Sequence, residues 1–123
     1  MKILLIVGLG GFAGSVLRLL VSEFFQTKSL SSFPYGTLSV NIIGCFLIGL
    51  VFGFVEKGQL SIEWRYFLAT GILGGFTTFS AFSYETFYLI RHDQFLNAMI
   101  YVLLSVVCGV MATAAGFYLH KYL

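Results

Sequence analysis

The sequence is short of charge, and this shortage limits what the protein can be. Asp, Glu, Lys and Arg make up only 10% of the 123 residues, whereas hydrophobic residues make up 59% and the mean hydropathy is +0.95. A water-soluble domain carries roughly 25% charged residues. The composition therefore excludes a water-soluble fold. A net charge of +2 without a basic cluster also argues against nucleic-acid binding.

Cysteine is equally scarce, and its two copies lie in the middle of separate apolar segments. Cys45 and Cys108 form no Cys-x-x-Cys pair and have no histidine close in sequence. We predict that they are buried apolar thiols rather than metal ligands. An enzyme is not expected either, because the serines of the third apolar segment and the distant His92 and His120 offer no nucleophile–base pair.

Apolar sequence is abundant and falls into four long runs. Each run is near or above the ~20 residues that cross a ~30 Å hydrocarbon core; the runs cover residues 3–21, 35–55, 64–90 and 95–119. The only proline, Pro34, directly precedes the second run, where a helix start tolerates it. Lys2 and the first run imitate a signal peptide, but three further runs follow, so we expect no cleavage. The sequence thus predicts an all-α membrane protein in which residues 1–123 form one domain of four transmembrane helices.

The basic residues between the runs specify orientation only weakly. Positive charge in short loops sets the topology of a membrane protein. If the four segments alternate, one side receives Lys2, Lys57, Arg65 and Lys121, and the other receives Lys28, Arg91 and, if its side chain reaches the interface, Arg18. Two interpretations follow: a single orientation, or insertion in both directions with pairing as an antiparallel, dual-topology homodimer.

Several of the 14 glycines recur at spacings typical of helix contacts. Gly10 and Gly14 in the first segment, and Gly49 and Gly53 in the second, are each separated by one helical turn. Such pairs let transmembrane backbones approach closely, which compensates for the absence of a hydrophobic driving force between helices in lipid. We therefore expect both pairs to mark helix–helix contacts.

Polar residues inside the second and fourth segments form two rows at i,i+4 spacing. The rows are Thr37, Asn41 and Cys45 in the second segment, and Tyr101, Ser105, Gly109 and Thr113 in the fourth. A polar group in hydrocarbon costs free energy unless protein or water satisfies it. Taken alone, the rows are compatible with hydrogen bonding between helices or with the lining of a pore.

The third segment contains a cluster of poor helix formers in its middle. Gly74 and Gly75 are adjacent, and Thr77 and Thr78 follow them. These residues predict a break in the third helix near the bilayer centre. A break leaves backbone carbonyls without intrahelical partners, and such groups persist in a membrane only within protein or bound to an ion. A small cation held by carbonyls is one solution.

After this cluster, phenylalanine recurs every three residues. Phe76, Phe79 and Phe82 alternate with Ser80 and Ser83. Such a stripe is commonly core or lipid contact. A ring edge nevertheless carries partial positive charge, and hydroxyl and amide groups donate hydrogen bonds without net charge. Together these groups are able to replace the hydration shell of a small anion, as carbonyls do for potassium in cation filters.

Two charged residues lie one to two turns from the ends of their segments, Arg18 in the first and Glu85 in the third. Long charged side chains at such positions commonly extend to the membrane interface. For Arg18 the alternative is a positive vestibule that raises the local concentration of anions.

The third-segment motif Gly-Gly-Phe-Thr-Thr-Phe-Ser-Ala-Phe-Ser-Tyr-Glu (74–85) resembles the Fluc fluoride channels, also called the CrcB family. Tyr-Gly-Thr-Leu-Ser-Val-Asn (35–41) and Leu-Arg (17–18) support the resemblance, which covers essentially the whole chain. It implies an antiparallel dual-topology homodimer with two pores. Such a dimer would lie in the plasma or inner membrane and export fluoride from the cytoplasm by passive flow.

The resemblance also implies roles for individual residues. Backbone carbonyls of Gly74 and Thr77 would hold a central structural sodium ion, and Arg18 would lie near the vestibule. The residues implied to line the pore are Asn41, Phe79, Phe82, Ser83, Tyr101, Ser105 and Thr113, with Glu85 beside them. Several relatives carry a serine where this chain has Gly109, so the hydroxyl row has one donor fewer.

The runner-up interpretation is a small multidrug-resistance-type exporter coupled to protons. Such a carrier needs an ionisable carboxylate deep in the helix bundle. The first segment has none, and Glu85 lies near the end of the third segment. A subunit without transport activity would not explain the donor rows together with the broken helix.

Overall fold

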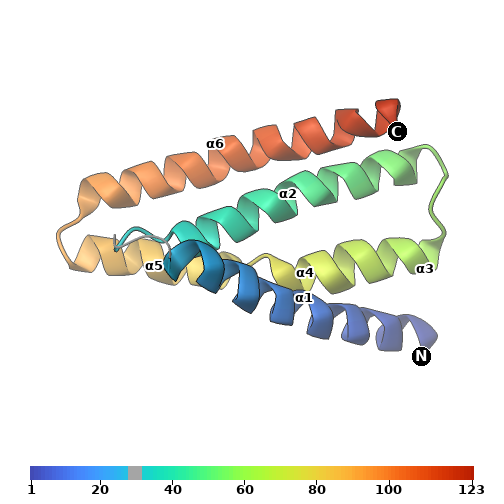
Figure 1. Cartoon of the computed structure of the whole chain (residues 1–123), viewed down its shortest axis with the longest axis horizontal. Helices are drawn as coiled ribbons and strands as arrows, with labels where there is room; N and C mark the ends of the chain where they lie inside the picture. The colour runs from blue at the N-terminus through green and yellow to red at the C-terminus, as the bar shows by residue number, and fades with distance from the viewer. Residues whose placement is uncertain (28–31) are drawn as a thin grey trace.

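The computed structural model describes residues 1–27 and 32–123, and its described secondary structure is all helical. Three long helices, α1 (Lys2–Thr27), α2 (Tyr35–Glu56) and α6 (Phe95–Leu119), are long and apolar enough to cross a membrane (Figure 1). The third segment consists of α3 (Ile62–Arg65), the π-helical segment η1 (Tyr66–Leu73), α4 (Gly74–Phe76) and α5 (Phe79–Arg91). A final 3₁₀ turn, η2, covers His120–Tyr122. The four predicted helical segments are present, and α1 continues six residues beyond the predicted end of its span.

Residues suited to turns and helix caps lie at the boundaries between the helices. Pro34 precedes α2, and Gly58 after α2 adopts a positive φ of 68°, a conformation that glycine tolerates without strain. The Ser61 hydroxyl accepts a hydrogen bond from the Trp64 N–H at the start of α3 (3.4 Å). Asp93, with φ 58°, makes the tight turn between α5 and α6. Because the four helical segments run alternately in opposite directions, both termini lie at the same end of the molecule (Figure 1).

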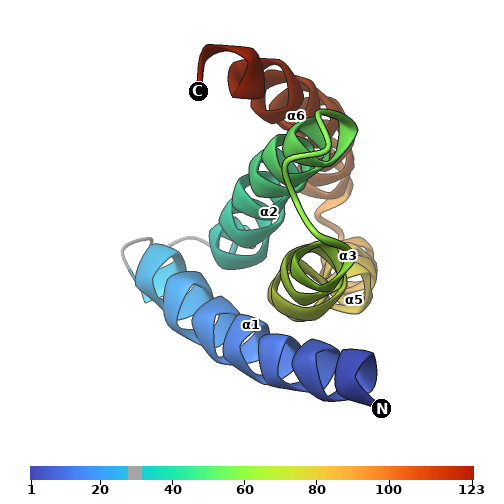
Figure 2. The same ribbon diagram turned by 90° about the vertical axis from the view of Figure 1, so that its right-hand side faces the viewer.

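The helices pack in two groups that meet at the middle of the molecule. Helix α1 lies against η1 and α4, and α2 lies along α6, so α1 and α6 occupy opposite sides (Figure 2). Glycines permit both contacts. A Cβ atom on Gly10 would lie 3.0 Å from the Cα of Gly71, and one on Gly49 would overlap the carbonyl of Thr113. The predicted contact glycines are confirmed for both pairs, because Gly14 meets η1 and Gly53 meets the His120 ring.

The third helix is broken at Thr77 and Thr78. Both residues are extended, with φ −84° and ψ 157° at Thr77 and φ −150° and ψ 120° at Thr78. The prediction of a broken third helix is therefore confirmed. Gly74 and Gly75, which contributed to that prediction, remain helical, so the interruption begins after them.

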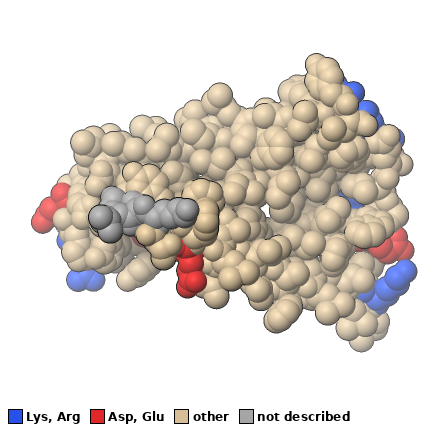
Figure 3. Space-filling model, in the orientation of Figure 1, with Lys and Arg blue, Asp and Glu red and all other residues tan. Residues whose placement is uncertain are grey.

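The outer surface is apolar along most of its length. Side chains such as Leu4, Phe12 and Met111 are 65–71% exposed. On the face shown in Figure 3, Lys and Arg gather near the two ends of the molecule. This distribution is consistent with a multi-pass membrane protein, because lipid solvates the apolar middle and water the charged ends. Lys28, which was counted in the charge balance, lies outside the described residues.

Candidate functional site

A side chain from α2 holds the break in the third helix. The Asn41 amide donates from Nδ2 to the Thr78 carbonyl (3.1 Å) and accepts at Oδ1 from the Thr78 N–H (2.9 Å). The Thr78 hydroxyl in turn accepts from the Ala81 N–H (3.2 Å) and so caps α5. One asparagine therefore satisfies both backbone groups of the residue where the helix is interrupted, as burial in a membrane protein requires.

These bonds remove the normal donors of two carbonyl groups. In an unbroken helix the Gly74 carbonyl would accept from the Thr78 N–H, and the Thr77 carbonyl from the Ala81 N–H. The first N–H is bound to Asn41 and the second to the Thr78 hydroxyl. Among the described residues, no group of three or more His, Cys, Asp or Glu side chains is placed to hold a metal. These two carbonyl groups are the ones that the family resemblance assigns to a sodium ion.

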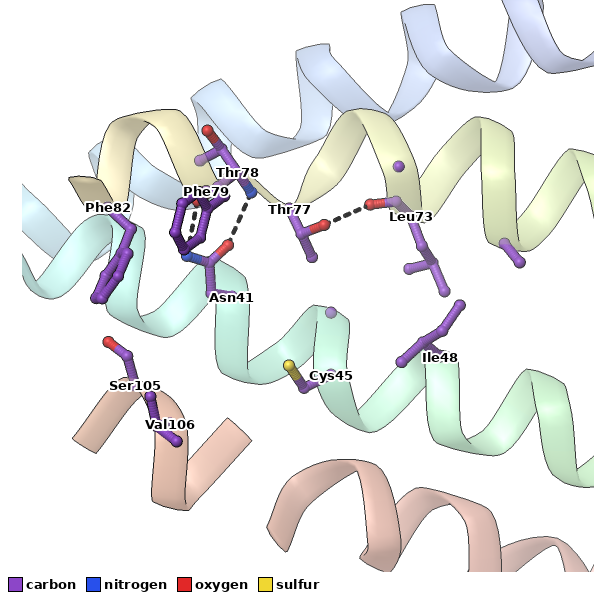
Figure 4. A pocket seen from close by; sticks show the side chains of 13 residues that line it. Asn41, Cys45, Ile48, Leu73, Thr77, Thr78, Phe79, Phe82, Ser105 and Val106 are labelled. Carbon is purple, nitrogen blue, oxygen red and sulfur yellow. Dashed lines mark hydrogen bonds between the residues drawn. The ribbon is translucent and has the colours of Figure 1, made fainter. Parts of the chain in front are cut away.

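A hollow of about 390 Å³ opens beside the break (Figure 4). Predominantly apolar and uncharged polar side chains from α2, the third segment and α6 surround it; those labelled in the figure include Asn41, Cys45, Thr77, Thr78, Phe79, Phe82 and Ser105. The Phe79 ring centroid is 5.5 Å from that of Phe82, which is 5.2 Å from that of Tyr101. The structure thus joins the aromatic stripe of α5 to the polar row of α6.

Exposure changes sharply along this aromatic series. Phe79 is 78% exposed at the open end, whereas Tyr101 is completely buried. Tyr101 also packs edge-on against Phe33, with ring centroids 5.6 Å apart. The series therefore leads from the surface of the single chain into its core.

The predicted hydroxyl groups differ in their surroundings. Ser105 lines the hollow, and its buried Oγ atom has no hydrogen-bond partner among the residues that the structure describes. The Thr113 hydroxyl donates to the Gly109 carbonyl of its own helix (3.1 Å). Neither Thr113 nor the exposed Ser83 lines this hollow. Ser105 is thus the member of this group that the structure places beside Phe82 and Asn41.

Arg18 and Glu85 both line a second hollow of about 560 Å³, between α1, α2 and α5. The Glu85 carboxylate accepts a hydrogen bond from the Thr37 hydroxyl and another from the Tyr101 hydroxyl, both 2.7 Å long. Hydroxyl groups of α2 and α6 therefore bind the Glu85 carboxylate, which links α5 to both of these helices. The Thr78 residue of the break lines both hollows.

Sequence reasoning missed two participants in this arrangement. Thr37 appeared only as a member of the α2 row, although it is buried and binds Glu85. Thr78 was recognised as a poor helix former but not as the residue that connects Asn41 to the start of α5. The i,i+4 spacing of Thr37 and Asn41 was the available signal, because it places both on the face of α2 that meets the third segment.

Comparison with known proteins shows which family this chain belongs to. Residues 5–117 match the family model described as "CrcB-like protein, Camphor Resistance (CrcB)". A fluoride-specific ion channel FluC from Flavobacterium psychrophilum is 46% identical over 124 residues, with 100% of both chains covered. Two further channels with the same name are each 45% identical to this chain. The match to the channel from Parabacteroides distasonis covers 98% of this chain and 93% of the relative, and the match to the channel from Rhizobium meliloti covers 98% of both. With matches over its full length, this chain belongs to the CrcB family.

Proposed function

We propose that this chain is a passive, fluoride-selective channel that exports fluoride from the cytoplasm and protects the cell against fluoride toxicity. The observation that carries the proposal is the continuous series from Phe79 through Phe82 to Tyr101, beside the buried Ser105 hydroxyl. The names of the full-length relatives support the choice of ion. A multi-pass position in the cell's plasma or inner membrane follows from the same proposal.

The proposed path selects for an anion without using a fixed positive charge, because no described Lys, Arg or His residue lines the first hollow. Phenyl ring edges present partial positive charge, and the Ser105 hydroxyl and the second Asn41 N–H are donors that no described hydrogen bond uses. Such groups replace part of the water around a small anion as it passes. Arg18 at the second hollow raises the local anion concentration before entry. Binding stays weak at each step, which permits conduction.

The working assembly in this proposal is an antiparallel homodimer with two pores. The weak charge bias supports insertion in both orientations, and the exposed Phe79 and Gly74 give a second copy a surface to cover. A central sodium ion would be held by the Gly74 and Thr77 carbonyls, whose usual donors are occupied elsewhere. When bound, the ion would replace the missing hydrogen-bond donors of these oxygens and stabilise the break. Exchange of sodium for a larger cation should lower both dimer stability and flux.

Ion efflux from liposomes tests the proposal directly. Purified protein should release fluoride rapidly and chloride hardly at all, with no applied pH gradient. Phe82→Ile should fold normally but reduce fluoride flux strongly, because it removes the ring edge next to Tyr101. Phe87→Ile on the same helix is the matched control, since Phe87 is 55% exposed and lines neither hollow. Equal flux of the two anions, or full activity of Phe82→Ile, would refute the proposed mechanism.

The position of Glu85 supports one alternative, a small multidrug-resistance-type exporter coupled to protons. Its carboxylate lies inside the bundle, bound to Thr37 and Tyr101, where a proton-coupled carrier needs an ionisable group. The same liposomes distinguish the two functions. Uptake of a quaternary ammonium dye that depends on a proton gradient, without fluoride flux, would favour the exporter and exclude the channel.

A further inference from the structure

The polar row of α6 has a gap at Gly109, and a thiol from α2 faces this gap. Tyr101, Ser105 and Thr113 carry hydroxyl groups at i,i+4 spacing, whereas Gly109 between them has no side chain. A Cβ atom placed on Gly109 would lie 3.4 Å from the Cys45 Sγ atom. The Cys45 thiol would therefore be in van der Waals contact with any side chain at residue 109.

Cys45 belongs to the lining of the first hollow rather than to the closed core. It is only partly buried and shares the lining with Asn41, Phe82 and Ser105, as Figure 4 shows. Ser105 is part of this lining, and its buried Oγ atom has no hydrogen-bond partner among the described residues, so the hollow contains a polar atom with unused hydrogen-bonding capacity. Beyond the gap, the Thr113 hydroxyl already donates within its own helix.

We infer that the Cys45 thiol is a further residue of the anion path and supplies, from α2, the donor that Gly109 lacks. The inference rests on the proposed channel function and adds a specificity-determining residue to it. An S–H group is a weak, polarisable donor and remains uncharged in this role. Its place between Asn41 and the α6 row continues the series of uncharged donors along the hollow.

A small thiol reagent tests whether the thiol faces the path. Methyl methanethiosulfonate converts a thiol into a methyl disulfide and releases methanesulfinate, which adds one bulky group at a known atom. Treatment with the reagent should reduce fluoride flux at least fivefold in the parent protein and in Cys108→Ser. The same treatment should leave the fluoride flux of Cys45→Ser unchanged. Cys108 is the matched control because it lines neither hollow. Failure of Cys45 to react, or reaction confirmed by mass spectrometry without loss of flux, would overturn the inference.

A donor swap separates hydrogen bonding from packing. Cys45→Ala should reduce fluoride flux roughly three- to tenfold, the rate equivalent of one lost hydrogen bond. Adding Gly109→Ser to this variant should restore most of the flux, whereas adding Gly109→Ala should not, because alanine fills space without donating. Equal rescue by both residues would show that Cys45 only packs. If the parent protein carries no fluoride at all, the proposed function fails; if it conducts but ignores these changes, only the present inference fails.

Discussion

The double hydrogen bond between Asn41 and Thr78 leads to a quantitative prediction for stability. In Asn41→Ala the Thr78 N–H and C=O both lose their partner at the break. A buried polar group left unpaired costs about 1–3 kcal/mol. Because Thr78 is only partly buried, the lower part of this range applies to each group, which gives a loss of about 2–4 kcal/mol in the free energy of unfolding.

The measurement is reversible unfolding in mixed detergent micelles, followed by circular dichroism. Asn97→Ala is the matched control, because Asn97 makes a single described bond to the Gln94 side chain (3.1 Å) near the start of α6. Gln94 retains a second partner, Ser32, so this control should lose less than about 1 kcal/mol. If Asn41→Ala loses no more than Asn97→Ala, the asparagine does not hold the break.

Two further predictions concern packing and the buried tyrosine. Gly10→Ala should destabilise the protein by about 1–3 kcal/mol in the same unfolding assay, because its Cβ atom would lie 2.9 Å from the Phe67 carbonyl oxygen. Gly8→Ala is the control and should leave the unfolding free energy unchanged, because its Cβ atom would have no neighbour within 4 Å. Equal effects of the two substitutions would contradict the contact at Gly10. Tyr101→Phe keeps the ring contacts but removes the bond to the Glu85 carboxylate. It should cost about 1.5–3 kcal/mol, and an unchanged unfolding free energy would show that this bond does not stabilise the bundle.

Prediction from sequence succeeded best where a local pattern has one physical meaning. The Gly10 and Gly49 spacings predicted close backbone contacts, and the structure places η1 and α6 against them. The exact point of the break was harder to predict. Glycine lowers helix propensity but does not forbid a helix, and Gly74 and Gly75 remain in α4. The break falls at Thr78 because a partner on α2 satisfies its main chain there.

The surroundings of individual site residues depended on contacts that the sequence does not record. Ser83 and Ser105 look equivalent as hydroxyls inside apolar segments, yet one is exposed and the other has a buried, unpartnered Oγ atom. Glu85 is near the end of its segment in sequence but is drawn inward by hydroxyls from two other helices. Phe79 and Phe82 share a stripe, but only Phe82 reaches Tyr101.

The sequence by itself determined that this is a membrane protein with four helical segments, a weakened third segment and rows of uncharged donors. Hydropathy and helical spacing are local properties, so the residues alone reveal them. Only the tertiary structure decided which donors meet: Asn41 at the break, Glu85 between Thr37 and Tyr101, and Cys45 opposite Gly109. These pairings depend on how neighbouring helices are rotated and shifted against each other, which close glycine contacts fix in three dimensions.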